Sequence, residues 1–205
     1  MFIDRYLERK NRLDPKWIRQ DEMEFAWFCE FLNRQYSAGG MTYLEIGSRF
    51  GGSMFVAAEF LAKPAHIVCV DQPAMGWGSK KSDGPLKKLA KTVRSEGHTV
   101  EIVFADSQIE KTRDDVERRL AGREVDVLFL DADHTYKGVS RDFELYSSLV
   151  RPGGIIAFHD VAPKQENPKV EVPLFWQSLV KKYPDSCRQC VHQAGRFGIG
   201  VLFKP

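Results

Sequence analysis

The sequence predicts a doubly wound α/β fold, with a mostly parallel seven-stranded sheet, helices on both faces and a C-terminal antiparallel hairpin. Five short apolar or β-branched runs after residue 42 predict the parallel strands, because segments of helical period separate them. Size is the other observation: 205 residues with 43% hydrophobic and 28% charged side chains suit one folded domain rather than a disordered or fibrous chain.

The elements follow one another in a regular order. Helical periodicity covers residues 56–61, 86–93, 109–120 and 139–150, and glycines or prolines flank these stretches. The turn-forming run Pro152-Gly153-Gly154 is expected to end the last of these helices. The predicted parallel strands are residues 43–46, 67–70, 100–104, 125–130 and 155–158, and the hairpin spans 188–203.

Residues 1–36 differ from the rest and are expected to form a helical cap on a domain that spans residues 37–205. An aromatic face on this cap consists of Phe25, Phe28, Phe31, Leu32 and Tyr36. Packing on the sheet is the favoured role for this face, since amphipathic helices usually cover a core. A substrate pocket and a dimer contact remain alternatives, so a homo-oligomer is possible.

Composition bears on partners and on compartment. Thirty basic and 28 acidic side chains are interleaved, so nothing favours nucleic acid as a partner. No apolar run approaches the roughly 20 residues of a membrane span, and charge stands where a signal peptide would be apolar. Four cysteines are too few for a disulfide framework, so a cytoplasmic protein with reduced thiols is expected. The C-x-x-C spacing of Cys187 and Cys190 is attributed to chance, because only His192 stands nearby as a further ligand.

A glycine-rich loop follows the first predicted strand. It contains Gly47, Gly51 and Gly52, and such residues let a ligand approach the backbone closely. The spacing matches neither the G-x-G-x-x-G dinucleotide motif nor the P-loop, which needs a Gly-Lys-Ser or Gly-Lys-Thr ending. A pyrophosphate cradle is therefore not expected.

Acidic residues stand at three successive strand ends: Glu45, Asp71 and Asp106. Ligands of open α/β sheets bind at the carboxyl ends of the strands, where a carboxylate such as Asp71 can accept hydrogen bonds from ribose hydroxyls. Two long loops, residues 72–84 and 161–173, suit lids or binding segments, and Trp77 of the first loop is a candidate to fold over a ligand. The acids favour a nucleoside with a positive rather than an anionic substituent.

These motifs, in this order, resemble the class I S-adenosylmethionine-dependent methyltransferases, which have a Rossmann-like fold. The resemblance implies S-adenosylmethionine as cofactor. It also implies the cofactor-binding residues Glu45, Gly47, Ser48, Gly51, Gly52, Ser53, Asp71, Gln72, Asp106, Ser107 and Asp131.

A second group of residues follows the fourth and fifth predicted strands. The fourth ends in Asp131 and the fifth in His159-Asp160, so neighbouring strand ends bring Asp131 and Asp160 together. Two carboxylates can hold a hard divalent cation, which lowers the pKa of a bound hydroxyl. His134 titrates in the range needed for a base that removes the hydroxyl proton.

The run Asp131-x-x-His134-x-Tyr136, with His159-Asp160 after it, is similar to a narrower group, the macrocin and mycinamicin sugar O-methyltransferases and cephalosporin hydroxylase-like proteins. The similarity extends over about residues 20–205. It implies Asp131 and Asp160 as ligands of magnesium, and His134 as the base. His159 stands where the sugar enzymes have an acid, and imidazole is a poor ligand for magnesium. Three alternatives follow: His159 points elsewhere, the metal is a softer one such as manganese, or there is no metal.

The sequence therefore predicts metal-assisted methyl transfer to a hydroxyl of a small molecule such as a sugar, natural product or phenol. Asp131 and His134 are the expected catalytic residues, and Asp131, His159 and Asp160 the expected metal ligands. Arg49 and Trp77 are expected near the acceptor. A hydroxylase-like reaction and a non-catalytic cofactor-binding protein on the same scaffold are the alternatives; product mass separates the first from methylation.

Overall fold

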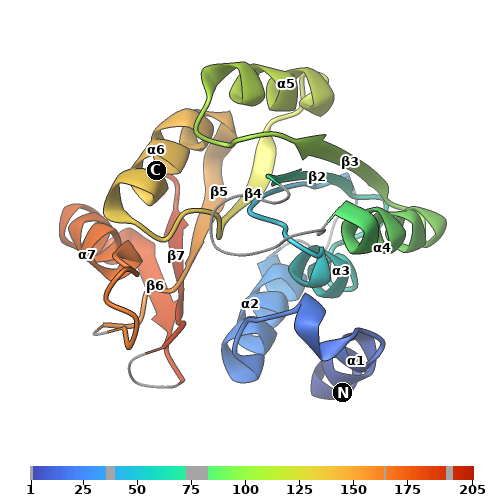
Figure 1. Cartoon of the computed structure of the whole chain (residues 1–205), viewed down its shortest axis with the longest axis horizontal. Helices are drawn as coiled ribbons and strands as arrows, with labels where there is room; N and C mark the ends of the chain where they lie inside the picture. Colours follow the sequence, from blue (N-terminus) through green and yellow to red (C-terminus); the bar gives the residue numbers. More distant parts are fainter. Residues whose placement is uncertain (1, 36–39, 73–82, 164, 193–195) are drawn as a thin grey trace.

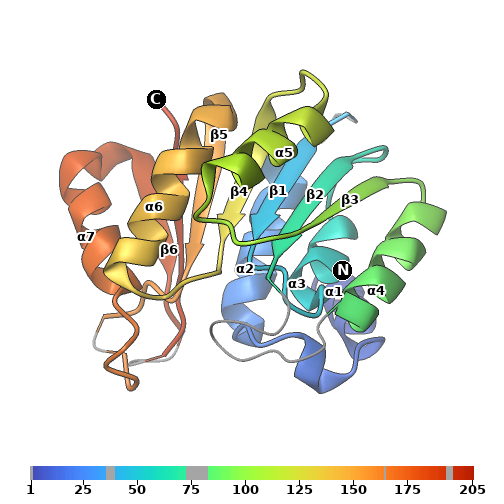
Figure 2. The same ribbon diagram turned by 45° about the horizontal axis from the view of Figure 1, so that its top comes forward.

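A computed structural model describes residues 2–35, 40–72, 83–163, 165–192 and 196–205. Its seven-stranded sheet has the order β3-β2-β1-β4-β5-β7-β6 (Figures 1 and 2), which confirms the predicted fold. The first five strands are parallel, whereas β7 runs antiparallel to both β5 and β6. The strands are β1 (Thr42–Ile46), β2 (His66–Asp71), β3 (Thr99–Phe104), β4 (Val125–Leu130), β5 (Val150–His159), β6 (Cys187–Cys190) and β7 (Ile199–Phe203).

Helices cover both faces of the sheet. On one face, α2, α3 and α4 share a core cluster with α1, which packs outside α3. On the other face, α5, α6 and α7 enclose a second cluster. The helices are α1 (Phe2–Asn11), α2 (Glu22–Gln35), α3 (Gly52–Ala58), α4 (Asp83–Ser95), α5 (Glu110–Leu120), α6 (Tyr136–Tyr146) and α7 (Val172–Lys182). None of the helices traced in these segments has the length and apolar character needed to cross a membrane.

The aromatic face of α2 covers the sheet, as favoured from the sequence. Phe25 and Phe28 are fully buried, and their ring centroids lie 6.1 and 5.2 Å from that of Phe129 on β4. Phe31 meets Phe203 of β7 at 5.6 Å. Tyr36 lies outside the described residues. Helix α2 is therefore part of the core on that side of the sheet.

One predicted element is wrong. Pro152-Gly153-Gly154 does not end a helix, because α6 stops at Tyr146 and β5 already begins at Val150. The turn-forming residues lie within β5 instead. Val125 pairs with Val150 but Val127 pairs with Ile155, so the run is absorbed as a bulge between these two registers.

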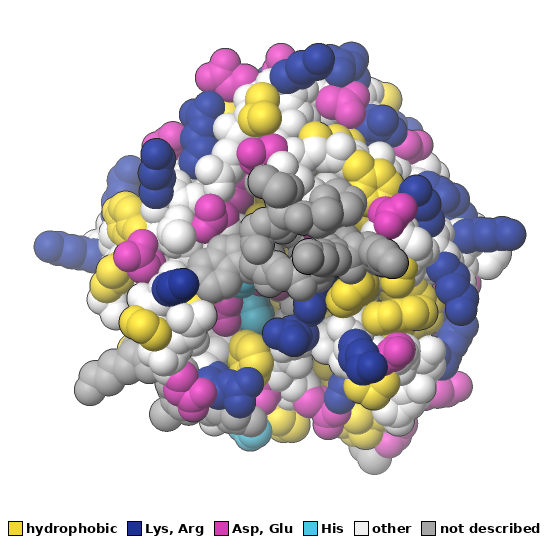
Figure 3. Space-filling view, viewed as in Figure 1, with side chains coloured by type: hydrophobic (Ala, Val, Ile, Leu, Met, Phe, Trp, Pro, Cys, Tyr) yellow, Lys and Arg dark blue, Asp and Glu magenta, His cyan; other side chains and the backbone are white. Residues whose placement is uncertain are grey.

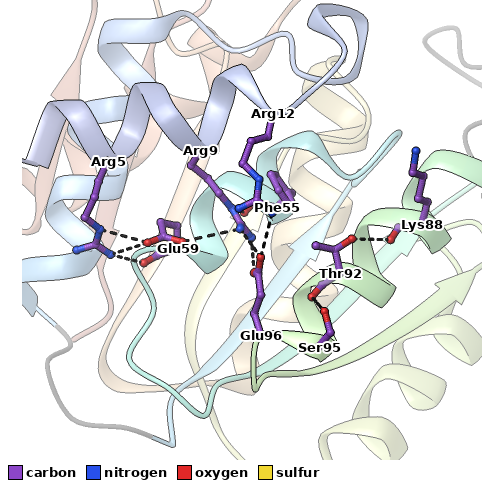
Figure 4. Close-up of polar contacts among 9 residues, drawn as sticks. All are labelled: Arg5, Arg9, Arg12, Phe55, Glu59, Lys88, Thr92, Ser95 and Glu96. Atoms are coloured by element: carbon purple, nitrogen blue, oxygen red, sulfur yellow. Dashed lines mark hydrogen bonds and ion pairs between the residues drawn. The ribbon is translucent and has the colours of Figure 1, made fainter.

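Helix α1 is fastened to the domain by a buried arginine (Figure 4). The Arg9 guanidinium donates to both carboxylate oxygens of Glu96, at 2.6 and 2.7 Å, and to the Phe55 carbonyl at 2.9 Å. It also lies 3.5 Å from the centroid of the Phe55 ring. Arg5 and Arg12 add ion pairs at the surface, to Glu59 and to Glu96 respectively. Arg9 thus joins α1 to both α3 and the end of α4.

Candidate functional site

A cavity of about 570 Å³ opens at the carboxyl ends of β1 to β5. This is the edge of a parallel sheet where α/β proteins bind ligands. Loops that follow all five of these strands contribute to its wall. The N-terminal segment before α2 and the loop between β6 and β7 complete it. Figure 3 shows this face, with a histidine and acidic side chains visible beside the grey residues at its centre.

The loop after β1 is shaped by Gly47. This residue has φ +95°, and its N–H and that of Ser48 donate to the Val70 carbonyl at 2.8 and 3.1 Å. A Cβ on Gly47 would lie 2.2 Å from the backbone oxygen of Asp131. Glycine is therefore required at this position, because the loop passes directly against the end of β4.

The other loop glycines pack rather than face the cavity. Gly51 has φ +83° before α3, and a Cβ there would lie 2.8 Å from Leu86. A Cβ on Gly52 would lie 2.1 Å from the Trp17 carbonyl oxygen. Neither residue lines the cavity, whereas Gly47, Ser48 and Ser53 do. Gly51 and Gly52 act by bringing the helix and the N-terminal segment close to the loop.

Glu45 lies beneath this loop and is fully buried. Its carboxylate accepts hydrogen bonds from the Tyr43 hydroxyl at 2.7 Å and from the Ser53 hydroxyl at 2.8 Å. Burial raises the pKa of Glu45 to about 7, against the lowering effect of these hydrogen bonds. Glu45 does not line the cavity. The structure thus places it as a support for the loop and not in the cavity wall.

The remaining residues predicted to bind a nucleoside do line the cavity: Asp71, Gln72, Asp106 and Ser107. Asp71 Oδ1 accepts the Arg49 N–H at 2.9 Å, which ties the ends of β1 and β2 together. The Ser107 carbonyl accepts the Tyr146 hydroxyl at 2.8 Å. Trp77 lies outside the described residues.

The second predicted group forms a compact centre at the ends of β4 and β5. His134 Nδ1 lies 2.7 Å from Asp160 Oδ2. One ligand atom each of Asp131, His134 and Asp160 can be chosen so that all three lie within 4.8 Å of one another. Burial lowers the pKa of His134, but the Asp160 hydrogen bond and the charge of Asp131 outweigh it, so the net shift is upward. The predicted meeting of Asp131 and Asp160 is therefore present.

His159 lies against the same two carboxylates but outside the cluster with ligand geometry. Its side chain is only 4% exposed, and its ring centroid lies 5.6 Å from that of Phe197. Nδ1 is 3.1 Å from Asp131 Oδ1 and 3.5 Å from Asp160 Oδ1. Burial opposes its charge, yet the two carboxylates hold the pKa of His159 well above its ordinary value. Within the described residues, the cluster with ligand geometry contains His134 where the sequence favoured His159.

The centre also includes residues that no sequence motif indicated. Gln20 Nε2 donates to Asp131 Oδ2 at 2.8 Å, which brings the N-terminal segment into the site. Gln165 Nε2 donates to the carbonyls of Asp160, Ala162 and Phe197, each at about 3 Å. The Glu171 N–H donates to the His134 carbonyl at 2.7 Å. The contacts of Gln20 with Asp131, of Gln165 with Phe197 and of Glu171 with His134 join segments far apart in sequence, so spacing alone carries no signal of them.

Comparison with known proteins identifies the family. Residues 44–161, more than half of the chain, match the model of a methyltransferase domain family. The chain belongs to this methyltransferase family. The match runs from within β1 to just past the end of β5 and includes both residue groups of the cavity. It confirms the resemblance to class I S-adenosylmethionine-dependent methyltransferases.

Individual proteins are similar to this chain in sequence or in fold. An uncharacterized protein of Acanthamoeba polyphaga mimivirus is 30% identical over 141 residues, which are 69% of this chain. The matched part is 61% of the length of that protein. An O-methyltransferase from Bacillus cereus, solved in complex with SAH, has a TM-score of 0.64 at 18% identity, covering 99% of this chain and 90% of its own. MycE, from the mycinamycin biosynthetic pathway and solved with Mg and SAH, has a TM-score of 0.62 at 18% identity, covering 100% of this chain and 55% of its own.

The four cysteines are free thiols. Cys187 and Cys190 lie on β6, opposite Leu202 and Ile199 of β7. Among the residues with described positions, neither thiol joins a cluster of side chains that could hold a metal.

Proposed function

We propose that this methyltransferase transfers the methyl group of S-adenosylmethionine to a hydroxyl oxygen of a small molecule, with His134 as the base. The observation that carries the proposal is the 2.7 Å contact between His134 Nδ1 and Asp160 Oδ2 inside the cavity. A carboxylate on Nδ1 fixes the tautomer and orientation of an imidazole, so that Nε2 is the nitrogen that takes a proton. Alcohol methylation needs such a base because the hydroxyl must lose its proton.

The cofactor has a consistent place in the same cavity. Asp71 and Gln72 suit the ribose hydroxyls, and Asp106 and Ser107 suit the adenine end. The loop at Gly47 then lies along the remaining part of the cofactor, toward Asp131. In this arrangement Glu45 acts through Ser53 and not by touching the cofactor. A cofactor held in this way would present its methyl group between the Gly47 loop and His134.

The reaction balances with these groups. The acceptor oxygen forms a bond to the methyl carbon while the carbon–sulfur bond breaks, so SAH leaves as a neutral thioether. The hydroxyl proton passes to His134 Nε2. Asp160 stabilises the imidazolium that forms, as the raised pKa of His134 indicates, although burial alone would lower it. Alignment of oxygen, carbon and sulfur supplies the remainder of the rate enhancement.

A divalent cation fits the same centre. Asp131 and Asp160 would hold it through carboxylate oxygens, and it would lower the pKa of the acceptor hydroxyl when bound. The same cluster contains the imidazole of His134, and an imidazole suits manganese better than magnesium. The charge of His159 beside both carboxylates reduces the local negative charge that attracts a cation. We therefore expect manganese to support activity better than magnesium.

The first test is calorimetric titration with S-adenosylhomocysteine, with and without magnesium or manganese. Micromolar or tighter binding that Asp71→Ala abolishes is expected. Methyl transfer from labelled cofactor to a panel of hydroxyl compounds is then measured for His134→Asn and for His192→Asn. His192 is exposed and does not line the cavity, so it is the matched control. His134→Asn should lower transfer by about 10²- to 10⁴-fold and leave SAH binding unchanged.

Two results would contradict the proposal: no SAH binding under any condition, or full activity of His134→Asn. Chelation with EDTA followed by readdition of manganese tests the metal separately.

We also propose a cytoplasmic location and a small-molecule acceptor. The free thiols favour a reducing compartment such as the cytoplasm. A homo-oligomer stays a prediction.

A further inference from the structure

A glutamine of the N-terminal segment contacts the carboxylate at the end of β4. Gln20 Nε2 donates to Asp131 Oδ2 at 2.8 Å, and both residues line the cavity. We propose that Gln20 is a positioning residue that fixes the Asp131 carboxylate for methyl transfer. This inference rests on the proposed function and deepens it, since it adds a residue that lies outside residues 44–161, the part of the chain that matches the family.

Both ends of the Gln20 amide have partners. The Arg19 N–H donates to Gln20 Oε1 at 3.3 Å, while Nε2 donates to Asp131. If the amide oxygen and nitrogen were exchanged, the oxygen would face a carboxylate oxygen and the nitrogen would face a backbone N–H. Both hydrogen bonds would then be lost. The two contacts therefore determine that the donor end of the amide points at Asp131.

Asp131 lies where its carboxylate needs a fixed direction. Its N–H donates to the Ile46 carbonyl at 2.8 Å, which holds the backbone but not the side chain. Asp131 Oδ1 lies 3.1 Å from His159 Nδ1. Asp160 belongs to the same cluster, and two carboxylates at short range repel each other. A charge-assisted hydrogen bond from Gln20 to Oδ2 opposes rotation of the Asp131 carboxylate out of the cluster.

A neutral donor suits this position. A lysine or arginine side chain would also hold the carboxylate, but its positive charge would offset the charge of Asp131. The amide of Gln20 has no charge, so Asp131 keeps its own for a cation or for an acceptor hydroxyl. The Asp131 side chain is only 13% exposed, and a hydrogen bond so shielded from water is stronger than one at the surface.

Other contacts hold the segment that carries Gln20. The segment connects α1 to α2 and passes the start of α3, where the Trp17 carbonyl packs on Gly52 (Figure 1). Ile18 is buried in the core cluster of this face. Asp21 Oδ1 accepts two backbone N–H groups of the first turn of α2, at 2.9 and 3.2 Å. The segment therefore keeps its place without the Gln20 amide, so removal of the amide releases the Asp131 carboxylate and leaves the chain folded.

The experiment compares Gln20→Met and Gln20→Glu with wild type at neutral pH. The first variant keeps the length of the side chain and removes the donor. The second also removes the donor but keeps an oxygen that can accept the Arg19 N–H. Lys16→Met is the matched control, because Lys16 is exposed in the same segment and does not line the cavity. For each protein, kcat and KM of methyl transfer are measured, and calorimetry gives the affinity for SAH.

Both Gln20 variants should lower kcat by about 10- to 100-fold, the usual effect of removing a residue that orients another one at a reaction centre. SAH affinity and the KM of the cofactor should stay unchanged, and Lys16→Met should match wild type in every value. A purely structural role would lower stability and leave kcat of the folded protein unchanged. Unchanged kcat in a folded Gln20 variant, an equal loss of kcat and SAH affinity, or failure of both variants to fold overturns the proposal.

A double-mutant cycle tests the contact without any enzymatic activity. Urea unfolding of Gln20→Met, Asp131→Ala and the double variant gives the coupling between the two side chains, and a second cycle uses Lys16→Met in place of Gln20→Met. We expect a coupling of about tenfold in the unfolding equilibrium constant for Gln20 with Asp131, and none for Lys16. If wild type binds no SAH and transfers no methyl group, the proposed function fails. The coupling then decides whether Gln20 holds Asp131, and its absence overturns the proposal.

Discussion

Replacing Gly47 with alanine tests whether the close approach of the β1 loop to the end of β4 builds the site. Gly47 has φ +95°, and an added Cβ would lie 2.2 Å from the Asp131 oxygen and 2.7 Å from the Ala132 Cα. Gly97, in the turn after α4, has nearly the same φ, +99°, but its added Cβ would meet nothing within 4 Å. The two substitutions share the backbone strain and differ in steric contact.

The magnitudes follow from these two geometries. A left-handed conformation costs an alanine about 1–2 kcal/mol, and the less flexible unfolded chain returns about 0.4–1 kcal/mol. We therefore expect Gly97→Ala to lower the free energy of unfolding by about 1 kcal/mol. Gly47→Ala adds the overlap with backbone atoms, which can be relieved only by moving β4 or the loop. Overpacking of this kind costs about 1–3 kcal/mol, so the total is about 2–4 kcal/mol.

Urea unfolding of both variants measures the difference, provided that the slope of the transition is unchanged. Calorimetry with SAH gives a second readout, because Gly47→Ala displaces Asp131 while Gly97→Ala is remote from the cavity. We expect SAH affinity to fall only in Gly47→Ala. Equal destabilisation of the two variants, or unchanged SAH affinity in Gly47→Ala, would refute the assignment of this contact as the element that shapes the site.

Three further outcomes are expected. The folded-state pKa of Glu45, about 7, lies above the ordinary value of 4.5, so wild type should lose stability as pH rises from 4.5 to 7. Glu45→Gln should abolish most of that loss, about 3 kcal/mol; parallel pH profiles in urea unfolding would argue against it. Arg9→Gln should lower the free energy of unfolding by about 3 kcal/mol, because it breaks a largely buried ion pair with Glu96. Arg5→Gln, which breaks a more exposed ion pair with Glu59, should lower it by under about 1 kcal/mol. Similar shifts in melting temperature for the two variants would contradict this contrast. Glu24 is buried and accepts hydrogen bonds from the backbone N–H groups of His192 and Gly198. Glu24→Gln should therefore raise the hydrogen-exchange rates of those two amides. Unchanged protection would exclude Glu24 as the group that holds them.

Much of the fold could be predicted because each strand and helix carries its own periodic pattern. The strand 125–130 is continuously apolar apart from Asp126, and the structure has the same bounds. The failure at Pro152-Gly153-Gly154 has a physical cause. Turn residues signal a local change of direction, but whether that change ends a helix or forms a bulge within a strand depends on the neighbouring strand.

The candidate site was predictable where the chemistry lies at strand ends. Parallel strands bring their carboxyl ends to one edge, so Asp71, Asp106 and Asp131 meet in one cavity without knowledge of side-chain contacts. Side-chain direction was not predictable in the same way. Glu45 also stands near a strand end, yet it turns under the loop to Tyr43 and Ser53 instead of lining the cavity.

The sequence by itself determined the sheet, the glycine loop and the pairing of Asp131 with Asp160, because these depend on local periodicity and on the common direction of parallel strands. Only the tertiary structure showed that His134 joins the two carboxylates in one compact cluster, with the buried His159 beside it. It alone brought Gln20 to Asp131 and Arg19 to the cavity that Arg49 lines. Such contacts join segments separated by many residues, and they are fixed by packing of the whole domain, which no local pattern encodes.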